Sequence, residues 1–592
     1  MRDVIVIGAG GGGPVVAKEL AARGLDVLML EAGARNQNPE KEWSRLEWDS
    51  SNPIDGYLRF GPSDRKQPAW QRELPQNSLI LQIAGVGGTT LHYFGNCPRA
   101  YPGVFRGYRG ADRNEYDRTY EVPLSYKGLI PYYEWVEHTL PVATSPIGTK
   151  ERVFLSAAEK MGLPLQRGKD TVRASYRPQE NAILQPKGTA GRSHDPAKVR
   201  YPQAQGCTFC GHCAQGCVLP RGAPRNLKAK RSTDNSYVPM ALTADAWKKG
   251  GKAATLITDA FATAVLTEGS GESMRARAVR WRNTRTGEEH TEEAKVVVMA
   301  AGSVETPRLW LNSGLPNPND WVGRGLTTHL IEEVMGHMPR SVGASKGPGS
   351  GARVDYPGRG LLEATQIGPM GKVVFKTLSD SGMAGLYDNG SPTPAMGADT
   401  LGRLVGPELM KAMNTGGDSL MSIGVIIDDH VERHNRVTLS SFLPADEHGP
   451  VPRVEMHPRR MSKRTLANRD FMSGKAAELL KIAGATSVHR TNMPPLILHV
   501  HSTMRMGARE ADSVLDTNAE SRGVKGLFIA DTSSLANGLG GVNPTLTCQA
   551  IGTRTAEKIF QNYFGGSPWV RAEAPVVSTD PAVTKAVVAR GV

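Results

Sequence analysis

The sequence predicts a mixed fold that combines an α/β part at the N-terminus with an α+β part further along the chain. Residues 3–7 form a short apolar, β-branched run that leads directly into the glycine-rich segment 8–13, as a buried parallel strand followed by a tight turn does. The apolar run 296–299 repeats this strand pattern much later. Alternating segments such as 422–427, within residues 331–494, favour an antiparallel sheet.

The composition excludes several classes of protein. Of the 592 residues, 39% are hydrophobic and 22% are charged, which is an ordinary balance for a chain with a buried core and excludes fibrous, disordered and membrane-bundle proteins. The net charge of +13 is scattered, apart from short runs such as 228–231. We interpret it as a solvated basic surface, and expect no nucleic-acid binding because aromatic residues are not interleaved with the charges.

The chain contains no long uninterrupted apolar run, and its first residues lack the pattern of an export signal. A membrane-spanning helix needs about 20 apolar residues, so we expect no transmembrane segment. Without an export signal the expected location is the cytoplasm, or the periplasm only if a partner subunit carries the chain.

The N-terminal segment has the pattern of a dinucleotide-binding unit. Gly8 allows a tight turn, Gly10 lets backbone N–H groups approach a pyrophosphate, and Gly13 permits close packing of the next helix. Glu31 ends the following apolar run, where a carboxylate accepts hydrogen bonds from an adenosine ribose. This order of strand, turn, helix, strand and acid predicts a Rossmann-type unit, but it does not distinguish FAD from NAD.

Further motifs favour FAD through a family resemblance. Residues 85–92, Gly-Val-Gly-Gly-Thr-Thr-Leu-His, resemble the flavin loop of the glucose-methanol-choline (GMC) oxidoreductases, and residues 302–314 resemble a second signature of that family. Residues 322–329 and 435–439 match other recurring family segments. The resemblance implies an FAD cofactor, a Rossmann-type FAD-binding domain built from separated segments, and a substrate domain that contains an antiparallel sheet.

The resemblance also divides the chain into domains. We expect the FAD-binding domain to comprise residues 1–160, 200–330 and 495–565, with residues 200–230 as a cysteine-cluster insertion. The expected substrate-binding domain comprises residues 161–199 and 331–494, and residues 566–592 form a loosely attached C-terminal tail. The polar stretch 34–78 and the loops within 331–494 are expected to determine the substrate.

Several residues are implied to bind FAD. They are Gly87, Gly88 and Thr89 of the flavin loop, together with Val265, Asp531 and His92. Val265 resembles a family valine whose backbone meets the adenine, and Asp531 resembles a residue near the pyrophosphate and ribityl chain. His92 occupies the position of a histidine that is covalently bonded to flavin in some members; a noncovalent packing role is favoured, and both readings stay open.

The C-terminal part carries the implied catalytic residues. Residues 499–507 resemble the segment with the active-site histidine of the family, and alignment on Arg505 makes His499 the catalytic base and His501 the second candidate. An imidazole suits this role because its ordinary pKa is near neutral. Asn543 resembles the second member of the catalytic pair, and its amide would hold the substrate oxygen or the imidazole.

A cysteine cluster departs from the pattern of a simple oxidase. Four of the six cysteines lie within eleven residues, and they are Cys207, Cys210, Cys213 and Cys217. Their spacing is that of the bacterial ferredoxin run, and cysteine-rich inserts of some GMC dehydrogenases hold iron–sulfur clusters. We favour a 4Fe-4S or 3Fe-4S cluster over structural zinc, whose four-cysteine sites usually consist of two separated pairs, and over uncomplexed thiols.

These features predict an FAD-dependent dehydrogenase. It would oxidise a CH–OH group of a sugar, glycoside or other bulky alcohol by proton abstraction and hydride transfer to flavin N5. Its electrons would leave through the iron–sulfur cluster to an acceptor protein or a small partner subunit. The alternatives are an O2-using GMC oxidase without a cluster and a non-catalytic flavoprotein electron-transfer subunit.

Overall fold

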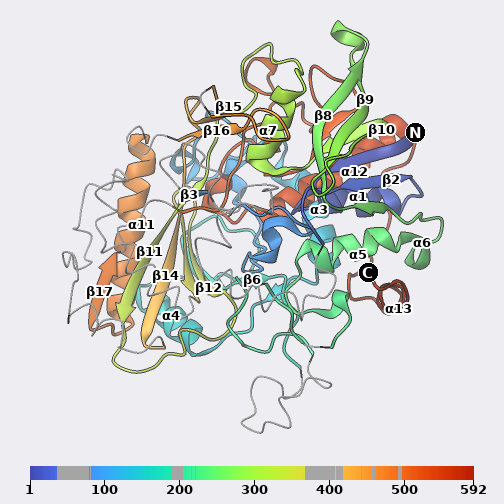
Figure 1. Ribbon diagram of the computed structural model, residues 1–592. Helices are drawn as coiled ribbons and strands as arrows, with labels where there is room; N and C mark the ends of the chain where they lie inside the picture. The colour runs from blue at the N-terminus through green and yellow to red at the C-terminus, as the bar shows by residue number, and fades with distance from the viewer. Residues whose placement is uncertain are drawn as a thin grey trace.

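The protein contains two large β-sheets that lie beside each other, with helices on their outer sides (Figure 1). The computed structural model describes residues 1–35, 79–80, 82–187, 205–214, 216–220, 222–366, 407, 418–441, 443–456, 461–490 and 496–592. The loops expected to determine the substrate fall mostly outside these ranges, at 36–78 and 367–417.

The first sheet contains the parallel strands predicted at the N-terminus. In order across the sheet they are β7 (Thr255–Ile257), β2 (Val27–Leu30), β1 (Arg2–Ile7), β10 (Glu289–Met299) and β19 (Leu527–Ile529). Val4, Ile5 and Val297 are fully buried, because strands of this kind are covered on both faces. Helix α1 (Gly13–Ala21) connects β1 to β2. The strands come from distant parts of the chain, which confirms the prediction of a Rossmann-type domain built from separated segments.

Strand β10 also belongs to an antiparallel ribbon. Its first half pairs with β9 (Arg275–Asn283), and β9 pairs with β8 (Ala260–Glu268). The second half of β10 pairs in parallel with β1. The ribbon of β8 and β9 extends away from the parallel strands at the top of Figure 1.

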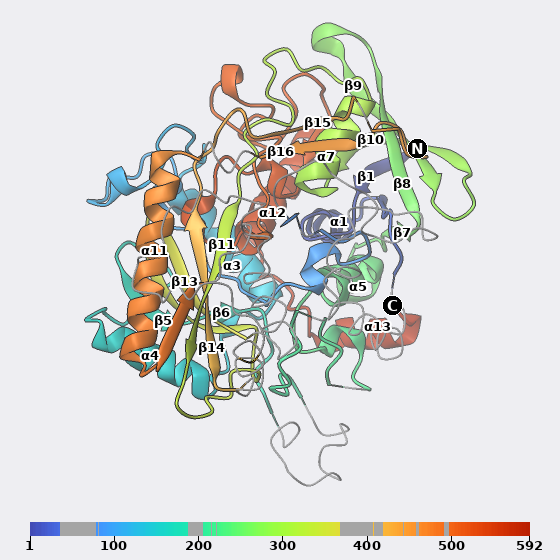
Figure 2. The ribbon, with the colours of Figure 1, turned by 60° about the vertical axis from the view of Figure 1, so that its left-hand side comes forward.

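The second sheet is almost entirely antiparallel, as predicted from the alternating segments. Its order is β3 (Leu79–Ile80), β18 (Leu496–Ile497), β11 (His329–His337), β14 (Leu420–Asp428), β13 (Gly360–Thr365), β12 (Ser350–Tyr356) and β5 (Ser175–Pro178), and β17 (Ser487–Arg490) also pairs with β11. Helices α11 (Lys463–Ile482) and α4 (Thr149–Lys160) cover its outer face (Figure 2). The pairing of β5 with β12 joins part of segment 161–199 to this sheet, while the domain bounds themselves stay a prediction.

The remaining elements are short or surround the first sheet. The helices are α3 (Tyr126–Thr139), α5 (Tyr237–Leu242), α6 (Ala244–Trp247), α7 (Gly302–Asn312), α12 (Thr545–Phe564) and α13 (Pro581–Arg590). Two small sheets pair β4 (Ala143–Thr144) with β6 (Glu180–Asn181), and β15 (Arg436–Leu439) with β16 (Pro452–Glu455). Within the described ranges, we find no helix with the length and apolar character needed to cross a membrane.

The C-terminal tail is held firmly, so the expectation of a loosely attached tail is wrong. Asn226 donates hydrogen bonds to the Ser578 carbonyl at 3.1 Å and to Thr584 Oγ1 at 2.7 Å. Arg590 forms an ion pair with Asp245 of α6 at 2.7 Å, and Val583 of α13 is fully buried. Helix α13 therefore packs against the segment that follows the cysteine loop.

A buried ion-pair group joins α11 to the second sheet. Glu332 of β11 accepts hydrogen bonds from Arg469 Nε at 2.8 Å and from Arg490 Nη2 at 2.7 Å. Burial alone would raise the pKa of Glu332, but the two guanidinium groups hold that pKa below its ordinary value. Removing this charge would take a counter-ion from two buried cations, of which Arg490 also contacts Asp470 at 3.7 Å.

We expect Glu332→Gln to lower the free energy of unfolding by about 3 kcal/mol, the range for breaking a buried ion pair. Because the pKa of Glu332 is lowered by folding, its stabilisation is present above the ordinary pKa of a glutamate and is lost as the pH falls through the lower, folded value. Chemical denaturation at neutral and acidic pH measures both effects. Glu478→Gln, at an exposed ion pair on α11, is the control and should change stability by less than about 0.5 kcal/mol. An equal loss in both variants would contradict the assignment.

Candidate active site

The glycine-rich loop after β1 lies against the flavin-loop segment predicted from the sequence. A Cβ at Gly8 would be 2.4 Å from the Ala300 carbonyl oxygen, so only glycine fits. The Gly87 N–H donates to the Ala9 carbonyl at 2.8 Å, and a Cβ on Gly88 would be 2.7 Å from Gly10 Cα. The two loops thus touch through bare backbone, the kind of cradle that a pyrophosphate needs.

Glu31 joins these loops through its carboxylate. Its side-chain oxygens accept hydrogen bonds from the backbone N–H groups of Ala9 at 2.8 Å, Gly33 at 2.9 Å and Gly85 at 2.9 Å. Burial raises the pKa of Glu31, and these three donors oppose that shift. A carboxylate has about four acceptor positions, so about one remains for a ribose hydroxyl.

Asp531 lies where β19 meets the N-terminus of α7. Its carboxylate accepts hydrogen bonds from the Gly302 N–H at 2.9 Å, the Thr306 hydroxyl at 2.6 Å and the Ser533 N–H at 2.7 Å. The carbonyl of the preceding Ala530 lies against Gly12, so close that a Cβ on Gly12 would be 1.8 Å from it. Asp531 is therefore next to the glycine-rich loop, as its predicted role near the pyrophosphate requires.

Val265 is not brought to the other predicted FAD residues. The Ala260 N–H donates to the Glu31 carbonyl at 2.8 Å, and Val265 lies five residues further along extended strand β8, roughly 17 Å away. Its own N–H donates to Ser313 Oγ at 2.9 Å. The predicted contact of Val265 with adenine has no support in these contacts.

The flavin loop contains the short 3₁₀ helix η2 (Gly88–Leu91), which ends at His92. Thr89 is exposed, whereas Thr90 is buried and donates to the Gly87 carbonyl at 2.5 Å. His92 Nδ1 is 2.7 Å from the Ala214 carbonyl of the cysteine loop, and burial lowers the pKa of His92 to about 4. Since a carbonyl only accepts hydrogen bonds, Nδ1 carries the proton, and a covalent bond to flavin would have to form at Nε2.

Three histidines meet where the C-terminal segment crosses the start of β11. His499 Nδ1 is 2.8 Å from His329 Nδ1, and His329 Nε2 is 2.5 Å from the Gly538 carbonyl. The rings of His499 and His501 each have their centre 4.9 Å from that of His329. His499 is half-buried, whereas His329 and His501 are fully buried. The rings of His499 and His501 thus both lie against a third imidazole, that of His329.

The pKa values of these imidazoles are lowered. For His499, burial and the neighbouring His329 place the pKa well below the ordinary value, and burial and the same neighbour do so for His501. The three rings are therefore neutral at neutral pH. Neither ring nitrogen of His501 has a hydrogen-bond partner within the described ranges.

Asn543 lies beside a buried carboxylate of the second sheet. Glu363 of β13 accepts hydrogen bonds from Asn96 Nδ2 to both oxygens at 2.9 Å and from Gln179 Nε2 at 2.9 Å. Burial raises the pKa of Glu363, and the Asn543 amide is one of the groups that oppose this shift. Asn543 Oδ1 is buried without a hydrogen-bond partner among the described residues, so it can accept a hydrogen bond from a ligand.

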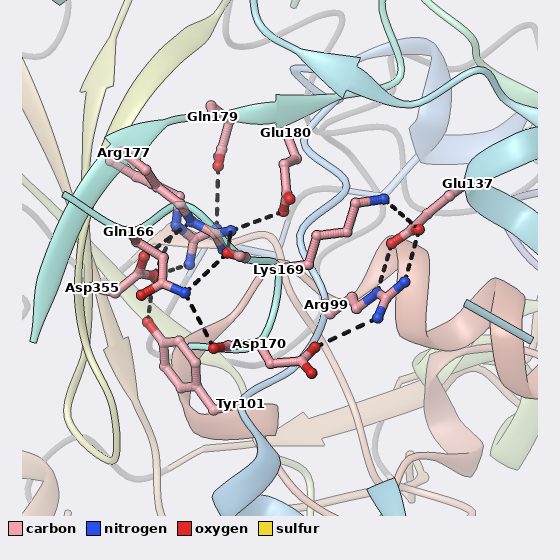
Figure 3. A network of polar contacts seen from close by, with 12 residues as sticks. Arg99, Tyr101, Glu137, Gln166, Lys169, Asp170, Arg177, Gln179, Glu180 and Asp355 are labelled. Atoms are coloured by element: carbon pink, nitrogen blue, oxygen red, sulfur yellow. Dashed lines mark hydrogen bonds and ion pairs between the residues drawn. The ribbon is translucent and has the colours of Figure 1, made fainter. Parts of the chain in front are cut away.

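A polar network supports Glu363 from behind. Gln179 accepts a hydrogen bond from Arg353 at 3.2 Å, and Arg353 Nε donates to Asp355 at 2.8 Å. Figure 3 shows Tyr101 and Arg177 converging on Asp355, with the Tyr101 hydroxyl 2.7 Å away and Arg177 Nε 3.3 Å away. The network spans from the segment after the flavin loop to the second sheet and holds the Glu363 partners in place.

The cysteine loop lies directly against the flavin loop. Lys230 is 1% exposed, and its Nζ donates to the carbonyls of Leu91, Tyr93 and Cys213, each at 2.7 Å. Burial lowers the pKa of Lys230 to about 8. Lys228 and Arg231 are also buried, so the interpretation of run 228–231 as solvated surface charge is wrong. These side chains instead provide buried positive charge beside the thiols.

The four thiols line one small cavity of about 20 Å³. Cys207 and Cys213 are buried, and Cys210 and Cys217 are half-buried. Burial raises the pKa of Cys210 to about 12, and the neighbouring Cys217 and Cys213 add to that shift. Within the described residues no group of three or more His, Cys, Asp and Glu side chains is arranged to hold a metal ion. A cubane would require the thiols to move apart, because the cavity has room for about one water molecule.

Comparisons with known proteins identify the family. The N-terminal and C-terminal domain descriptions of GMC oxidoreductases match residues 170–331 and 431–552. The chain belongs to the GMC oxidoreductase family. The fold agrees: the crystal structure of pyridoxine 4-oxidase from Mesorbium loti superposes with a TM-score of 0.57 over 96% of this chain and 100% of that one, at 16% identity.

Curated relatives of this GMC oxidoreductase include both dehydrogenases and oxidases. The chain is 26% identical to 2-methyl-1,2-propanediol dehydrogenase of Mycolicibacterium austroafricanum, covering 95% of each. It is 25% identical to the fructose dehydrogenase large subunit of Gluconobacter japonicus, covering 95% of this chain and 98% of that one. It is 27% identical to 6'''-hydroxyparomomycin C oxidase of Streptomyces lividus, covering 94% and 91%.

The family implies FAD, and the residues present fit that cofactor. The bare backbone at Gly10 and Gly88 suits a pyrophosphate, and the remaining acceptor position of Glu31 suits a ribose hydroxyl. The two loops are joined by the Glu31 carboxylate and by the backbone hydrogen bond from Gly87 to Ala9. The FAD-binding roles of Gly8, Gly13, Gly87 and Thr89 stay predictions.

Three residues of this GMC oxidoreductase were missed from its sequence. His329 is the last residue of segment 322–329, which matches a recurring segment of the family. The signal in the sequence was a histidine at the start of a strand. Lys230 lay in a basic run whose burial only the fold reveals. Nothing in the sequence indicated a role for Glu363 in the site, because a single acidic residue in an apolar strand is equally compatible with a salt bridge or with a position at the edge of a sheet.

We expect Glu31→Gln to weaken FAD binding about 30-fold, because one backbone donor would lose its acceptor in a buried place, at a cost of about 2 kcal/mol. The flavin content of purified protein and the Kd for FAD after deflavination measure this. Glu268→Gln, at an exposed site on β8, should bind FAD normally. In the unsubstituted protein, flavin that stays with the protein after acid precipitation would reveal a covalent bond between flavin and His92. Full FAD retention by Glu31→Gln would contradict the role of Glu31.

Proposed function

We propose that this GMC oxidoreductase is an FAD-dependent dehydrogenase that oxidises a CH–OH group of a sugar, glycoside or other bulky alcohol. The observation that carries the proposal is His499, a half-buried imidazole whose pKa is lowered by burial and by His329. Such a group is an unprotonated base throughout the neutral pH range. Relatives named for a diol, for fructose and for an aminoglycoside support this substrate class.

Two side chains would act on the substrate. His499 accepts the proton as the O–H bond of the alcohol breaks, and the imidazolium that results stabilises the alkoxide. Asn543 offers a buried acceptor, Oδ1, without a partner among the described residues. This atom would accept a hydrogen bond from a neighbouring hydroxyl group of the substrate, because the reacting hydroxyl gives its only proton to His499. FAD, when bound, supplies the acceptor for the hydride that leaves the carbon, and the product is a carbonyl compound.

The cysteine loop would hold an iron–sulfur cluster, either 4Fe-4S or 3Fe-4S. Cys207, Cys210, Cys213 and Cys217 would be its ligands, and it would supply one-electron transfer. The buried cation of Lys230, which is bonded to neutral carbonyls, favours an anionic group nearby. The hydrogen bond between His92 and the Ala214 carbonyl is a direct contact between this loop and the flavin loop, and Lys230 bridges the two loops through the carbonyls of Leu91 and Cys213. These contacts support electron transfer between the two loops.

The electron acceptor would be a protein or a small partner subunit. One relative is named as the large subunit of fructose dehydrogenase, which supports a partner for this chain. The cytoplasm is the proposed location, or the periplasm if such a partner carries the chain. Relatives named as oxidases keep O2 as an alternative acceptor, in which case the cysteine loop would hold no cluster.

We expect His499→Ala to lower kcat about 1,000-fold, because a general base contributes roughly 10²–10⁴, while FAD content stays unchanged. Turnover of 2-methyl-1,2-propanediol and fructose with an artificial acceptor or O2 provides the assay. Since the pKa of His499 is lowered, the proton binds only in acid, and kcat/KM should decline only below about pH 6.5. His501→Ala is the matched comparison. Full turnover by His499→Ala would contradict the proposal, and loss only in His501→Ala would transfer the role to His501.

We expect anaerobically purified protein to contain three or four iron atoms and about four acid-labile sulfides per flavin. Cys210→Ser should lower the iron content and remove the broad visible absorption, whereas Cys548→Ala, at a buried thiol outside the loop, should keep both. Elemental analysis with visible and EPR spectra measures this. Zinc in place of iron, or metal-free protein with rapid peroxide formation, would reject the cluster.

A further inference from the structure

His329 stands between a fixed backbone carbonyl and the proposed base. Its ring is fully buried at the start of β11. One ring nitrogen, Nε2, is 2.5 Å from the Gly538 carbonyl oxygen, and the other, Nδ1, is 2.8 Å from His499 Nδ1. Both distances are those of hydrogen bonds, so the proton positions in this chain are constrained.

The carbonyl decides which nitrogen of His329 carries the proton. A carbonyl oxygen only accepts hydrogen bonds, so His329 Nε2 must be the N–H donor. Burial lowers the pKa of His329 to about 4, so its ring is neutral at neutral pH and has a single proton. His329 Nδ1 therefore carries a lone pair, and it can only accept a hydrogen bond from His499.

We propose that His329 is a positioning residue that holds His499 as the Nδ1–H tautomer, so that His499 Nε2 is the atom that accepts the proton of the substrate. The opposite tautomer would point two nitrogen lone pairs at each other across 2.8 Å, which is repulsive. This inference rests on the proposed function of His499 as the base.

The same contact assists the proton transfer itself. When His499 Nε2 takes the proton from the hydroxyl group, the new imidazolium donates its Nδ1–H to the neutral His329. His499 then donates to His329, and His329 donates to the Gly538 carbonyl. The dipoles of these two consecutive hydrogen bonds are oriented so that they stabilise the positive charge on His499. No proton has to leave His329 during this step.

The arrangement also separates His499 from its neighbour. His501 packs against the same His329 ring, but it makes no hydrogen bond within the described parts of the chain. Its tautomer is therefore not fixed by a partner. Of the two candidate bases, only His499 has a hydrogen-bond partner that determines which of its ring nitrogens carries the lone pair.

Histidine-selective 15N NMR of the holoenzyme tests the tautomer without a substrate. We expect the His499 signals, assigned by their loss in His499→Ala, to report a protonated Nδ1 and an unprotonated Nε2. In His329→Leu the population should shift toward the Nε2–H form. His337→Leu, the same change at the other end of β11, should leave the signals unchanged. A His499 tautomer that is Nε2–H in the wild type, or that does not respond to His329→Leu, would overturn the proposal.

Kinetics of the same variants provide the second readout. His329→Leu should lower kcat about 100-fold with KM within threefold and full FAD content. His329→Gln, whose amide can both donate and accept, should recover at least tenfold of that loss. If His329→Gln does not recover the kcat lost in His329→Leu, and the His499 tautomer is unchanged in these variants, His329 has only a structural role and the proposal is rejected. Full turnover by His499→Ala would reject the proposed function, while the NMR result would still decide the tautomer.

Discussion

The carboxylate of Glu31 is the point where three separate segments of the chain are joined. Its oxygens accept the N–H groups of the glycine-rich loop, of Gly33 and of the flavin loop at Gly85. A buried carboxylate is costly without such donors, and the buried N–H groups need an acceptor in turn. The nucleotide loop and the flavin loop are therefore held together at this carboxylate, and the backbone hydrogen bond from Gly87 to Ala9 adds a second contact between them.

The flavin loop in turn fixes the cysteine loop through buried positive charge. Within the described residues, the Lys230 ammonium donates to the three carbonyls named above. Arg231 donates to the Asn235 carbonyl and to Ser578 of the C-terminal tail. Neutral oxygens compensate a buried cation only in part. The flavin loop, the thiol loop and the tail thus form one unit, in which an anionic group near the thiols would be stabilised.

The sequence was sufficient for features that depend on local pattern. The apolar run before Gly8, the acid at Glu31 and the alternating strand at 422–427 predicted both sheets, because strand periodicity and turn chemistry act over a few residues. Contacts between distant segments were not predictable in this way. Lys230 was interpreted as surface charge because two of its three carbonyl partners, Leu91 and Tyr93, come from a loop more than a hundred residues away. The contact of Val265 with adenine was implied only by the family resemblance, and it stays a prediction.

The proposed catalytic pair is positioned by the second sheet. His499 follows β18 of that sheet, whereas Asn543 lies on the loop after β19 of the first sheet. His499 lies against His329, the first residue of β11, and Asn543 lies beside Glu363 of β13. These two strands are both neighbours of β14, so their spacing is set by the hydrogen bonds of one sheet. The loop after β19 supplies the Gly538 carbonyl and then Asn543 itself, and a Cβ on its Gly541 would be 2.8 Å from Gly360 Cα of β13. If the two sheets moved relative to each other, His499 and Asn543 would therefore move together, and the geometry between these two residues would be preserved.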